Sequence, residues 1–300
     1  MSGAHESLFA RDGGEGAVMS GFVDLHTHST ASDGALAPAE LVERAARAGL
    51  TALALTDHDT LAGVAAAREA GARLGIRIVA GVELSVTDGA REIHLLGLHI
   101  ARVDALEAEL QSVRAARRTR AERIVDKLNA LGVPIAIEAV WVQVGDGAVG
   151  RPHVARALIA GGWARDPRDA FDRYLGAGRP ANVEKEPVTI ACGVRLIHDS
   201  GGLAVIAHPG QDGRRERIEP LVAMGLDGIE VLHPGHGPED IARLAALTEF
   251  FSIVPSGGSD WHGAITGPRV LGCMKVPAAW VQRQDARLAA RVPPKTATVA

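Results

Sequence analysis

The chain has 300 residues, which allows one large domain or two small ones, and its 47% apolar and 23% charged residues are typical of a globular protein with a sizeable core. The net charge of −4 excludes a general basic coat for nucleic acid, although not a local basic patch. The two cysteines, Cys192 and Cys273, lie far apart, which excludes a disulfide framework and thiolate metal sites and favours a reducing cytoplasm. No apolar run is long enough to cross a bilayer, so no membrane association is expected.

Residues 1–21 are rich in glycine and lack the apolar segment of a signal peptide, so a disordered extension is predicted there. Phe22 and Val23 then begin a strand that leads into a stretch containing His26, His28 and Asp33. Side chains at positions i and i+2 of a strand point to the same face. The two imidazoles are therefore expected to project together, with Asp33 returning toward them, as a site for a divalent metal.

Strands and helices alternate over the next part of the chain. A helix is predicted from residue 38 to 49, a strand over 51–55 that ends before His58, and a second helix to about residue 75. A strand over 77–80 leads to Glu83, and another over 93–100 carries His94 and His99. This alternation predicts a parallel α/β sheet or barrel. Polar side chains recur at the strand ends, where α/β barrels build their active sites.

Residues 103–186 are predicted to form an inserted helical subdomain, because strand signals are few. Its first helix carries five arginines between positions 114 and 123, which form either a solvated helix face or a basic wall for a phosphate-bearing ligand. Further along, Arg151 and His153 lie where a loop runs into a helix, and Arg179 lies in a Gly- and Pro-containing loop.

The α/β alternation resumes after the insertion. Helices are predicted over 188–200, 214–224 and 239–249, and strands over 203–207, 228–232 and 251–254. The first of these strands ends at His208, and the last leads to Asp260 and His262. The predicted division is thus a barrel over 22–102 and 187–285, the insertion over 103–186, and a flexible tail over 286–300.

Ten imidazoles and carboxylates form one candidate metal site. They are His26, His28, Asp33, His58, Glu83, His94, His153, His208, Asp260 and His262. Any one histidine alone is readily explained as a core residue bonded to a backbone carbonyl. Burying all of them at one rim without cations would be costly. Because the set lacks cysteine, it suits Mn, Fe or Zn.

The donor types favour hydrolysis. A carboxylate such as Glu83 can bridge two ions, and the bridged water then becomes a nucleophile near neutral pH. The sequence contains neither a G-x-S-x-G elbow nor a Walker-type loop, which leaves metal-assisted hydrolysis of a phosphoester or an amide.

Five ordered motifs resemble the PHP family (polymerase and histidinol phosphatase) over about residues 22–275. They are Asp24-Leu25-His26-Thr27-His28-Ser29, Leu55-Thr56-Asp57-His58-Asp59-Thr60, Gly81-Val82-Glu83, Ala207-His208-Pro209-Gly210 and Gly258-Ser259-Asp260-Trp261-His262-Gly263. The resemblance implies a distorted seven-stranded (β/α) barrel and a centre of two or three divalent ions, with manganese the first choice. It also implies a metal-bound hydroxide held by Glu83 and Asp260.

The resemblance further implies three ligand sets. One ion would take His26, His28, Glu83 and Asp260. A second would take Asp33, His58, His208 and His262. A third would take Glu83, His94 and His153.

Within the family, the helical insertion resembles the branch of nucleoside 3′,5′-bisphosphate phosphatases and 5′-to-3′ exoribonucleases. A nucleotide or a short 5′-phosphorylated RNA is then the expected substrate, and no obligate protein partner is inferred. Arg151, His99 and Arg179 are candidate substrate-binding residues, although each is as readily explained as a surface or core-edge residue.

Four other functions compete with this interpretation. A histidinol-phosphate phosphatase would need an acidic or aromatic pocket, whereas this insertion is rich in arginine and the chain has one Tyr and five Phe. A polymerase-associated module would lie in a far longer chain. An amidohydrolase would usually place a lysine at a strand end, and none occurs there. A non-catalytic binding protein would have lost several ligands, and all the expected positions are filled.

Overall fold

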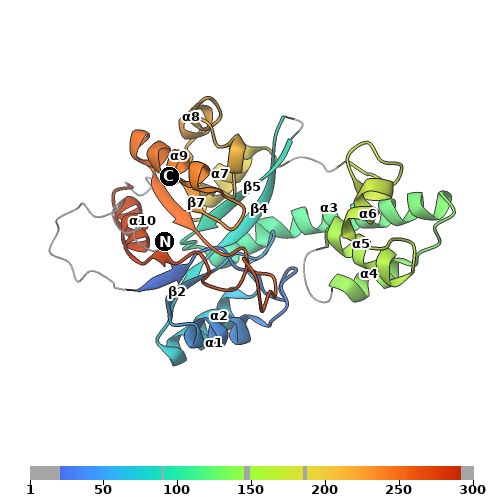
Figure 1. Cartoon of the computed structure of the whole chain (residues 1–300), viewed down its shortest axis with the longest axis horizontal. Coiled ribbons are helices and arrows are strands. Elements are labelled where there is room, and N and C mark those ends of the chain that lie inside the picture. The colour runs from blue at the N-terminus through green and yellow to red at the C-terminus, as the bar shows by residue number, and fades with distance from the viewer. Residues whose placement is uncertain (1–20, 90, 145–148, 185–187, 292–300) are drawn as a thin grey trace, which may run out of the picture.

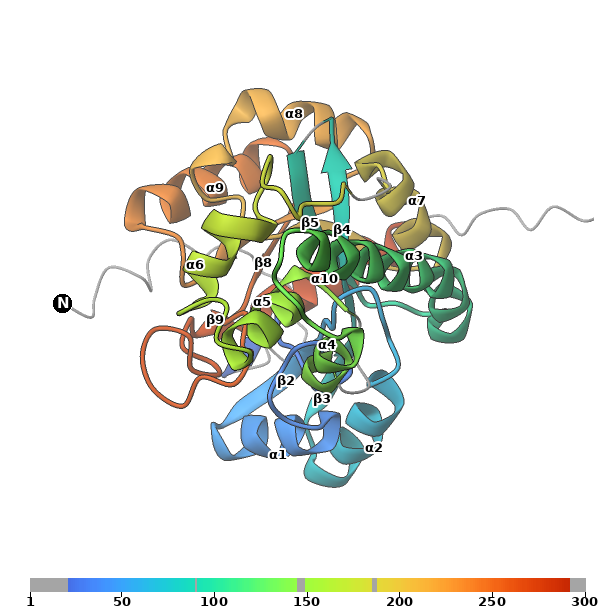
Figure 2. The same ribbon diagram turned by 90° about the vertical axis from the view of Figure 1, so that its right-hand side faces the viewer.

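Two β-sheets form the centre of the protein. The computed structural model describes residues 21–89, 91–144, 149–184 and 188–291, and Figures 1 and 2 show it from two sides. One sheet has the strand order β3-β2-β1-β9 and the other β4-β5-β6-β7-β8. The strands are β1 (Phe22–Asp24), β2 (Leu50–Leu55), β3 (Arg77–Ala80), β4 (Val82–Asp88), β5 (Arg91–Leu98), β6 (Leu203–Ile206), β7 (Gly228–Leu232), β8 (Val254–Gly257) and β9 (Val276–Pro277).

The strand directions depart from a purely parallel arrangement. Strands β1 to β3 pair in parallel, as do β6 to β8. Strands β4 and β5 form an antiparallel hairpin, β5 also runs antiparallel to β6, and β9 runs antiparallel to β1. The sequence reasoning missed β4 as a separate strand, so the expectation of simple alternation is wrong in this part of the chain.

The two sheets are joined by backbone hydrogen bonds at the ends of strands. The Leu25 N–H donates to the Gly257 carbonyl (3.0 Å), which joins the ends of β1 and β8. The Gly81 N–H donates to the Leu55 carbonyl (3.0 Å), which joins the end of β2 to the start of β4. A seven-stranded barrel is not confirmed, because the described strands lie in two open sheets of four and five strands. What is shown is a mixed α/β fold with two sheets joined at strand ends.

Helices surround the sheets (Figure 2). They are α1 (Pro38–Arg47), α2 (Val64–Leu74), α7 (Ile190–Asp199), α8 (Arg215–Ala223), α9 (Pro238–Phe250) and α10 (Ala279–Ala289). The first shows how the sequence sets the bounds: Pro38 occupies the first helical position, and Gly49 takes a positive φ of 76° just after the end. Its buried face, Leu41, Val42 and Ala45, packs into a cluster with residues of α2 and β2.

The residues between β5 and α7 form a helical projection (Figure 1). Its elements are α3 (Val103–Ala130), α4 (Ile137–Val144), α5 (Arg151–Ala160), α6 (Pro167–Ala170) and a π-helical turn (Phe171–Leu175). Buried side chains between Ala121 and Val183 pack into a hydrophobic cluster separate from the main core. Helix α3 belongs to both, since Leu106 and Leu110 lie in the main core while Ile124 and Leu128 lie in the second cluster.

Two expectations concern the ends of the chain. Residues 1–20 and 292–300 lie outside the described residues, so the predicted disorder there is untested. Helix α10 extends to Ala289, which corrects the predicted start of a flexible tail at residue 286. Its buried Trp280 and Val281 anchor it to the main core. Among the described helices, none combines the length and the hydropathy that a membrane span requires.

Candidate metal centre

The candidate ligands gather where the two sheets join. His26 and His28 follow β1, His58 follows β2, and Asp260 follows β8. Backbone bonds fix these segments: the His28 N–H donates to the Trp261 carbonyl (3.0 Å), and the Asp260 N–H to the His26 carbonyl (2.9 Å). The segments approach so closely that a Cβ on Gly258 would lie 2.4 Å from the Cβ of His26, so only glycine fits there. The ends of β1 and β8 are thereby held side by side.

Several backbones at this junction adopt positive φ without being glycine. The φ angles are 50° at Asp59, 29° at His208 and 50° at Asp260. Each N–H is bonded to another element: Asp59 to the Glu83 carbonyl (3.0 Å) and His208 to Glu230 Oε2 (2.7 Å), while Asp260 bonds to His26 as described above. Strained backbones of this kind persist where the surroundings fix them, and they cluster at functional sites.

Glu83, on β4, is the central carboxylate. It is 1% exposed, and five imidazoles surround its two oxygens. Its Oε1 lies 2.7 Å from His94 Nδ1 and 3.1 Å from His208 Nε2, and its Oε2 lies 3.2 Å from His26 Nε2, 3.2 Å from His28 Nε2 and 3.3 Å from His58 Nδ1. Burial alone would raise the pKa of Glu83, but these histidines outweigh it and hold the pKa well below its usual value. Glu83 is therefore an ionised carboxylate shared by several possible ligands.

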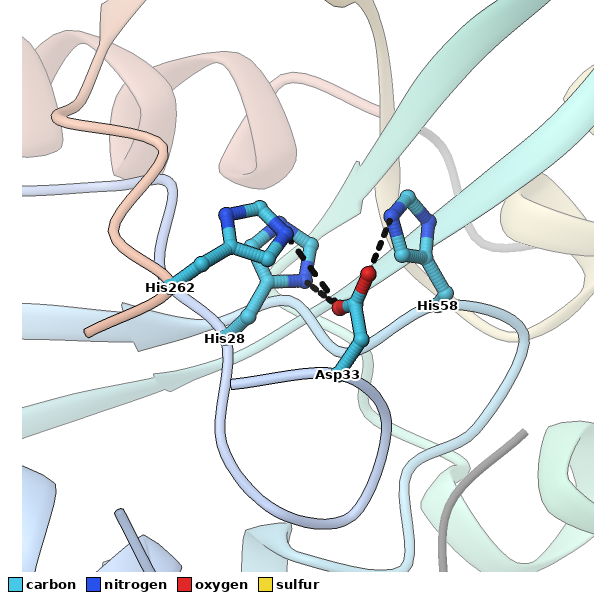
Figure 3. Close-up of side chains that lie close together, drawn as sticks. All are labelled: His28, Asp33, His58 and His262. Atoms are coloured by element: carbon cyan, nitrogen blue, oxygen red, sulfur yellow. Dashed lines mark ion pairs between the residues drawn. The ribbon is translucent and has the colours of Figure 1, made fainter. Parts of the chain in front are cut away.

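Three overlapping groups have donor atoms that all lie within 4.8 Å of one another. They are His26, His28, Glu83 and Asp260; His28, Asp33, His58 and His262; and His58, Glu83 and His94. We call these the first, second and third donor sets. Figure 3 shows the second set, in which Asp33 lies between the other three side chains and is 3.2 Å from His262 Nε2. The overlap places adjacent donor sets close enough to share ligands.

The donor sets agree with the predicted ligand sets in part. The first donor set contains the same four residues as the first predicted ligand set. In the second, His28 stands where His208 was expected, since His208 turns toward Glu83 Oε1 instead. The third contains His58 rather than His153. His153 is 2% exposed on α5, and its Nδ1 accepts a bond from the Gly150 N–H (3.0 Å), while its Nε2 is buried and has no hydrogen-bond partner among the residues that the structure describes. Burial lowers the pKa of His153 to about 4, so its imidazole is neutral.

The residues fit cations. Both ring nitrogens of His28, Nδ1 of His58 and Nδ1 of His94 are buried and make no well-directed hydrogen bond within the described part of the chain. Native proteins pair nearly all such buried polar atoms. Burial lowers the pKa of His58 to about 3, so this imidazole is neutral and has a free lone pair. Unpaired imidazole nitrogens facing ionised carboxylates are what Mn, Fe or Zn would satisfy.

The two carboxylate oxygens of Asp260 have different neighbours. Its Oδ1 lies 3.4 Å from His26 Nε2 and 3.3 Å from His28 Nε2. Its Oδ2 pairs with half-exposed Arg269 and lies 3.5 Å from His233 Nε2. Burial would raise the pKa of Asp260, but the neighbouring histidines hold it far below its usual range. Sequence reasoning did not count either residue among the candidates: His233 directly follows β7 but lies in no recognised motif, and Arg269 follows no strand end.

A layer of buried carboxylates behind the donor sets was also missed. Glu230, on β7, lies 2.9 Å from His26 Nδ1, and Asp57 accepts bonds from the Ser29 N–H (2.7 Å) and the Ser32 hydroxyl (2.7 Å). Such partners orient ligand side chains. The available signal was a lone carboxylate inside the apolar strand Gly228–Leu232, which cannot be buried without a partner.

The arginines of the insertion lie beside the site. Arg117 pairs with buried Asp59 and donates to the Ser85 hydroxyl (2.8 Å), and Arg151 lies 3.8 Å from Glu92. Burial lowers the pKa of Arg120, and the nearby cations Arg151 and Arg117 lower it further. Three guanidinium groups therefore lie close together on the side of the insertion that faces the β4–β5 hairpin.

Two predicted substrate residues are not brought to this site. His99 lies 2.8 Å from Gln284 Oε1 of α10 and 3.7 Å from Asp285. His94 lies within β5, whereas His99 follows its end and contacts α10, so the expected role of His99 in binding substrate at this site is corrected. Arg179 is exposed, and its backbone forms turns with Gly176 and Asn182.

A pocket of about 330 Å³ opens over the donor sets. Its walls include His58, Glu83, His94, His208, His233, Asp260, His262 and Arg269. The pocket is lined by imidazoles, two carboxylates and one guanidinium, so it suits a small anion that reaches cations held below it.

An α/β fold with clustered imidazoles and carboxylates at its strand ends has the architecture of a metal-dependent hydrolase. The model of the PHP domain matches residues 24–130. A 5′-3′ exoribonuclease of Haemophilus influenzae is 41% identical over 245 residues, which cover 80% of this chain and 89% of that protein. A 3′,5′-nucleoside bisphosphate phosphatase of Chromobacterium violaceum is 39% identical over 258 residues, covering 83% and 90%. The crystal structure of a presumed metal-dependent phosphoesterase from Bifidobacterium adolescentis superposes with a TM-score of 0.79 at 31% identity, covering 90% of this chain and 97% of that one. The chain belongs to the PHP domain family, as the sequence motifs predicted.

Proposed function

We propose that this protein is a metal-dependent phosphoesterase that removes the 3′-phosphate of nucleoside 3′,5′-bisphosphates and also trims short 5′-phosphorylated RNA from its 5′ end. The observation that carries the proposal is the set of unpaired buried imidazole nitrogens around ionised Glu83, beneath an anion-sized pocket. The activities of the Haemophilus and Chromobacterium relatives support the choice of substrate.

Two or three divalent ions would occupy the donor sets. The residues that would hold them are His26, His28, Asp33, His58, Glu83, His94, Asp260 and His262, with His208 and His153 at the border. When bound, the ions would activate a water molecule and offset negative charge on the phosphoryl group. Manganese is our first choice, with iron or zinc as alternatives, since imidazole and carboxylate ligands without thiolate suit all three.

The chain's own residues do the positioning. Glu230 orients His26 from behind, at 2.9 Å, and Glu83 holds five imidazoles in register. Arg269 also lines the pocket and pairs with Asp260. A phosphoryl group over the donor sets would thus meet a guanidinium on its solvent side, and guanidinium groups match phosphate oxygens geometrically.

The second phosphate of a bisphosphate would be bound by the arginines of the insertion. Arg117, Arg120 and Arg151 lie close enough to lower the pKa of Arg120, so an anion placed among them relieves their mutual repulsion. We expect Arg151 to contribute most directly, because it starts the same helix that carries buried His153. Arg179, being exposed and without contacts to this group, remains a weak candidate.

Histidinol-phosphate phosphatase is the alternative activity within the family. It would require an aromatic or acidic surface for an amine and an imidazole, whereas the pocket over the donor sets is lined by no Phe, Tyr or Trp of the described ranges, and its two carboxylates, Glu83 and Asp260, belong to the first donor set. A cytoplasmic location, expected from the cysteine content, remains a prediction.

The test is a substrate panel with the purified manganese-loaded protein. It compares adenosine 3′,5′-bisphosphate, a short 5′-phosphorylated RNA and histidinol phosphate, with release of phosphate and of nucleoside monophosphate as readouts. We expect the bisphosphate to yield the 5′-monophosphate and chelation to stop the reaction. Faster turnover of histidinol phosphate than of any bisphosphate would overturn the assignment.

Asp260→Asn provides the matching variant for this panel. It keeps the volume of the side chain but removes the charge from the first donor set, so turnover should fall while the fold is retained. Unchanged activity would remove Asp260 from the proposed ligands.

A further inference from the structure

A second pocket adjoins the candidate metal centre. It has a volume of about 280 Å³ and lies between the β5–β6 edge and helix α8. His94 and His208 line both this pocket and the pocket over the donor sets. The two spaces are therefore neighbours that share a wall of two imidazoles.

The walls of the second pocket differ in chemistry from those of the first. Its apolar part consists of Ile93, Ile206, Ala207, Pro209, Ile218 and Leu221. Its polar rim consists of Glu92, Asp212 and Arg217. Arg217 lies 3.1 Å from Asp88, and Asp212 lies 3.0 Å from Arg91, so each is balanced by a neighbour of opposite charge. The space is thus a largely aliphatic pocket without excess positive charge.

The aliphatic walls and the balanced charges at the rim limit the kind of ligand that the second pocket can bind. A phosphate in this pocket would face mostly aliphatic side chains and the carboxylates of Glu92 and Asp212. The guanidinium there, that of Arg217, is already paired with Asp88, so the pocket disfavours a second phosphoryl group. A flat, weakly polar group of modest size gains from covering the isoleucines, at roughly 25 cal/mol for each Å² of apolar surface buried. Binding sites for small molecules usually combine such an apolar surface with a few polar groups at the edge.

We propose that this second pocket binds the nucleoside part of the substrate, and this inference rests on the proposed phosphoesterase function. His94 and His208 face Glu83 at 2.7 and 3.1 Å, so a phosphoryl group over the donor sets lies directly across these rings from the apolar walls. At the rim, Glu92 lies 3.8 Å from Arg151, where the arginines of the insertion begin. A nucleoside in the pocket would thus lie between the donor sets and the arginines.

The proposal can be tested with substitutions that fill the second pocket with a larger side chain. Ile93 is only partly buried on β5, so Ile93→Trp directs added volume into the pocket rather than into the tightly packed core. Asp212→Trp, at an exposed rim position, narrows the entrance without touching the core and serves if the first variant folds poorly. Ile265→Trp is the matched control, because Ile265 is 73% exposed and lines neither pocket.

Two readouts separate the pocket from the catalytic centre. The first is the KM for adenosine 3′,5′-bisphosphate, which should rise at least tenfold in the filled variants and stay unchanged in the control. The second is calorimetric titration with adenosine 5′-monophosphate and with inorganic phosphate. Binding of the monophosphate should weaken at least tenfold in Ile93→Trp, whereas binding of inorganic phosphate should stay the same.

The outcomes are distinguishable. If Ile93→Trp and Asp212→Trp fold as the wild type does and bind adenosine 5′-monophosphate as tightly, the pocket does not hold the nucleoside. If both variants weaken inorganic phosphate as much as the monophosphate, the effect comes from a disturbed metal centre and the inference is again overturned. If the wild type hydrolyses no bisphosphate, the proposed function fails, while the titration still decides whether nucleosides bind in this pocket.

Discussion

Replacing Glu83 with glutamine should remove more bound metal than replacing either of the other two carboxylates of the donor sets, Asp33 and Asp260. Glu83 belongs to the first and third donor sets, whereas Asp260 belongs to the first alone and Asp33 to the second alone. Glutamine keeps the volume of the side chain but loses the charge, and its amide nitrogen would face imidazole nitrogens at 2.7–3.3 Å on either side. The second donor set contains no atom of Glu83 and should keep its ion.

The expected losses of metal and of turnover follow from the number of donor sets to which each carboxylate belongs. Elemental analysis of protein equilibrated with manganese should show Glu83→Gln losing the ions of two donor sets, and Asp260→Asn or Asp33→Asn losing one. Turnover of a bisphosphate by Glu83→Gln should fall by about 10³-fold, which corresponds to roughly 4 kcal/mol of activation free energy. Glu249→Gln is the control, since Glu249 forms an exposed ion pair with Arg283.

A folded Glu83→Gln protein that binds as much manganese as the wild type would refute the reasoning. So would equal loss of metal in Glu83→Gln and Asp33→Asn, because the two residues would then contribute to the same number of sites. Circular dichroism and the melting temperature of the metal-free proteins establish whether the fold is retained, so that loss of metal is not mistaken for loss of structure.

Three further predictions concern residues around the donor sets and the ends of the sheets. Glu230→Ala should weaken metal binding by about 10- to 100-fold, measured by competition with a chelator, because the carboxylate that orients a ligand imidazole is lost; an unchanged affinity would limit Glu230 to a structural role. Arg151→Ala should raise the KM for a 3′,5′-bisphosphate by about tenfold and that for a 3′-monophosphate less, and equal increases would show that Arg151 does not bind the second phosphate. Asp227→Asn should lower the free energy of unfolding by about 2 kcal/mol at neutral pH, as measured with urea. Burial would raise the pKa of Asp227, but His198 and Arg291 outweigh it and lower the pKa below 3.8, so this stabilisation is present above that pH and is lost as the pH falls through the folded-state pKa. A difference between the two proteins that persists unchanged in acid would contradict this account.

The candidate ligands could be predicted from sequence because their positions depend on local rules. A strand places its ends at the rim of a sheet, and imidazoles and carboxylates at several strand ends are rare enough to indicate metal binding. Which residues share an ion could not be predicted. His28 and His208 are chemically equivalent, and the choice between them in the second donor set depends on how β6 turns at His208, where φ is 29°.

The misplacement of His99 has a different origin. Five residues along a strand span about 16 Å, so His94 and His99 cannot both lie at one rim. The antiparallel hairpin of β4 and β5 determines at which end of the sheet His94 and His99 lie. Its sequence signal is Asp88-Gly89, a pair that favours tight turns between antiparallel strands. Reading the segment as a hairpin rather than as parallel α/β would have placed His99 away from the site.

The insertion contributes to the site through one helix that belongs to both cores. Leu106 and Leu110 pack in the main core and Ile124 and Leu128 in the second cluster, so the middle of α3, where Arg117 lies, is fixed at both ends. Figure 1 shows this helix running from the sheets into the projection. The ion pair of Arg117 with Asp59 anchors the same point directly to the segment that follows β2. The distance between the arginines and the donor sets is therefore set by one continuous helix that packs in both cores rather than by loops, which favours a substrate whose two phosphates are separated by a fixed span.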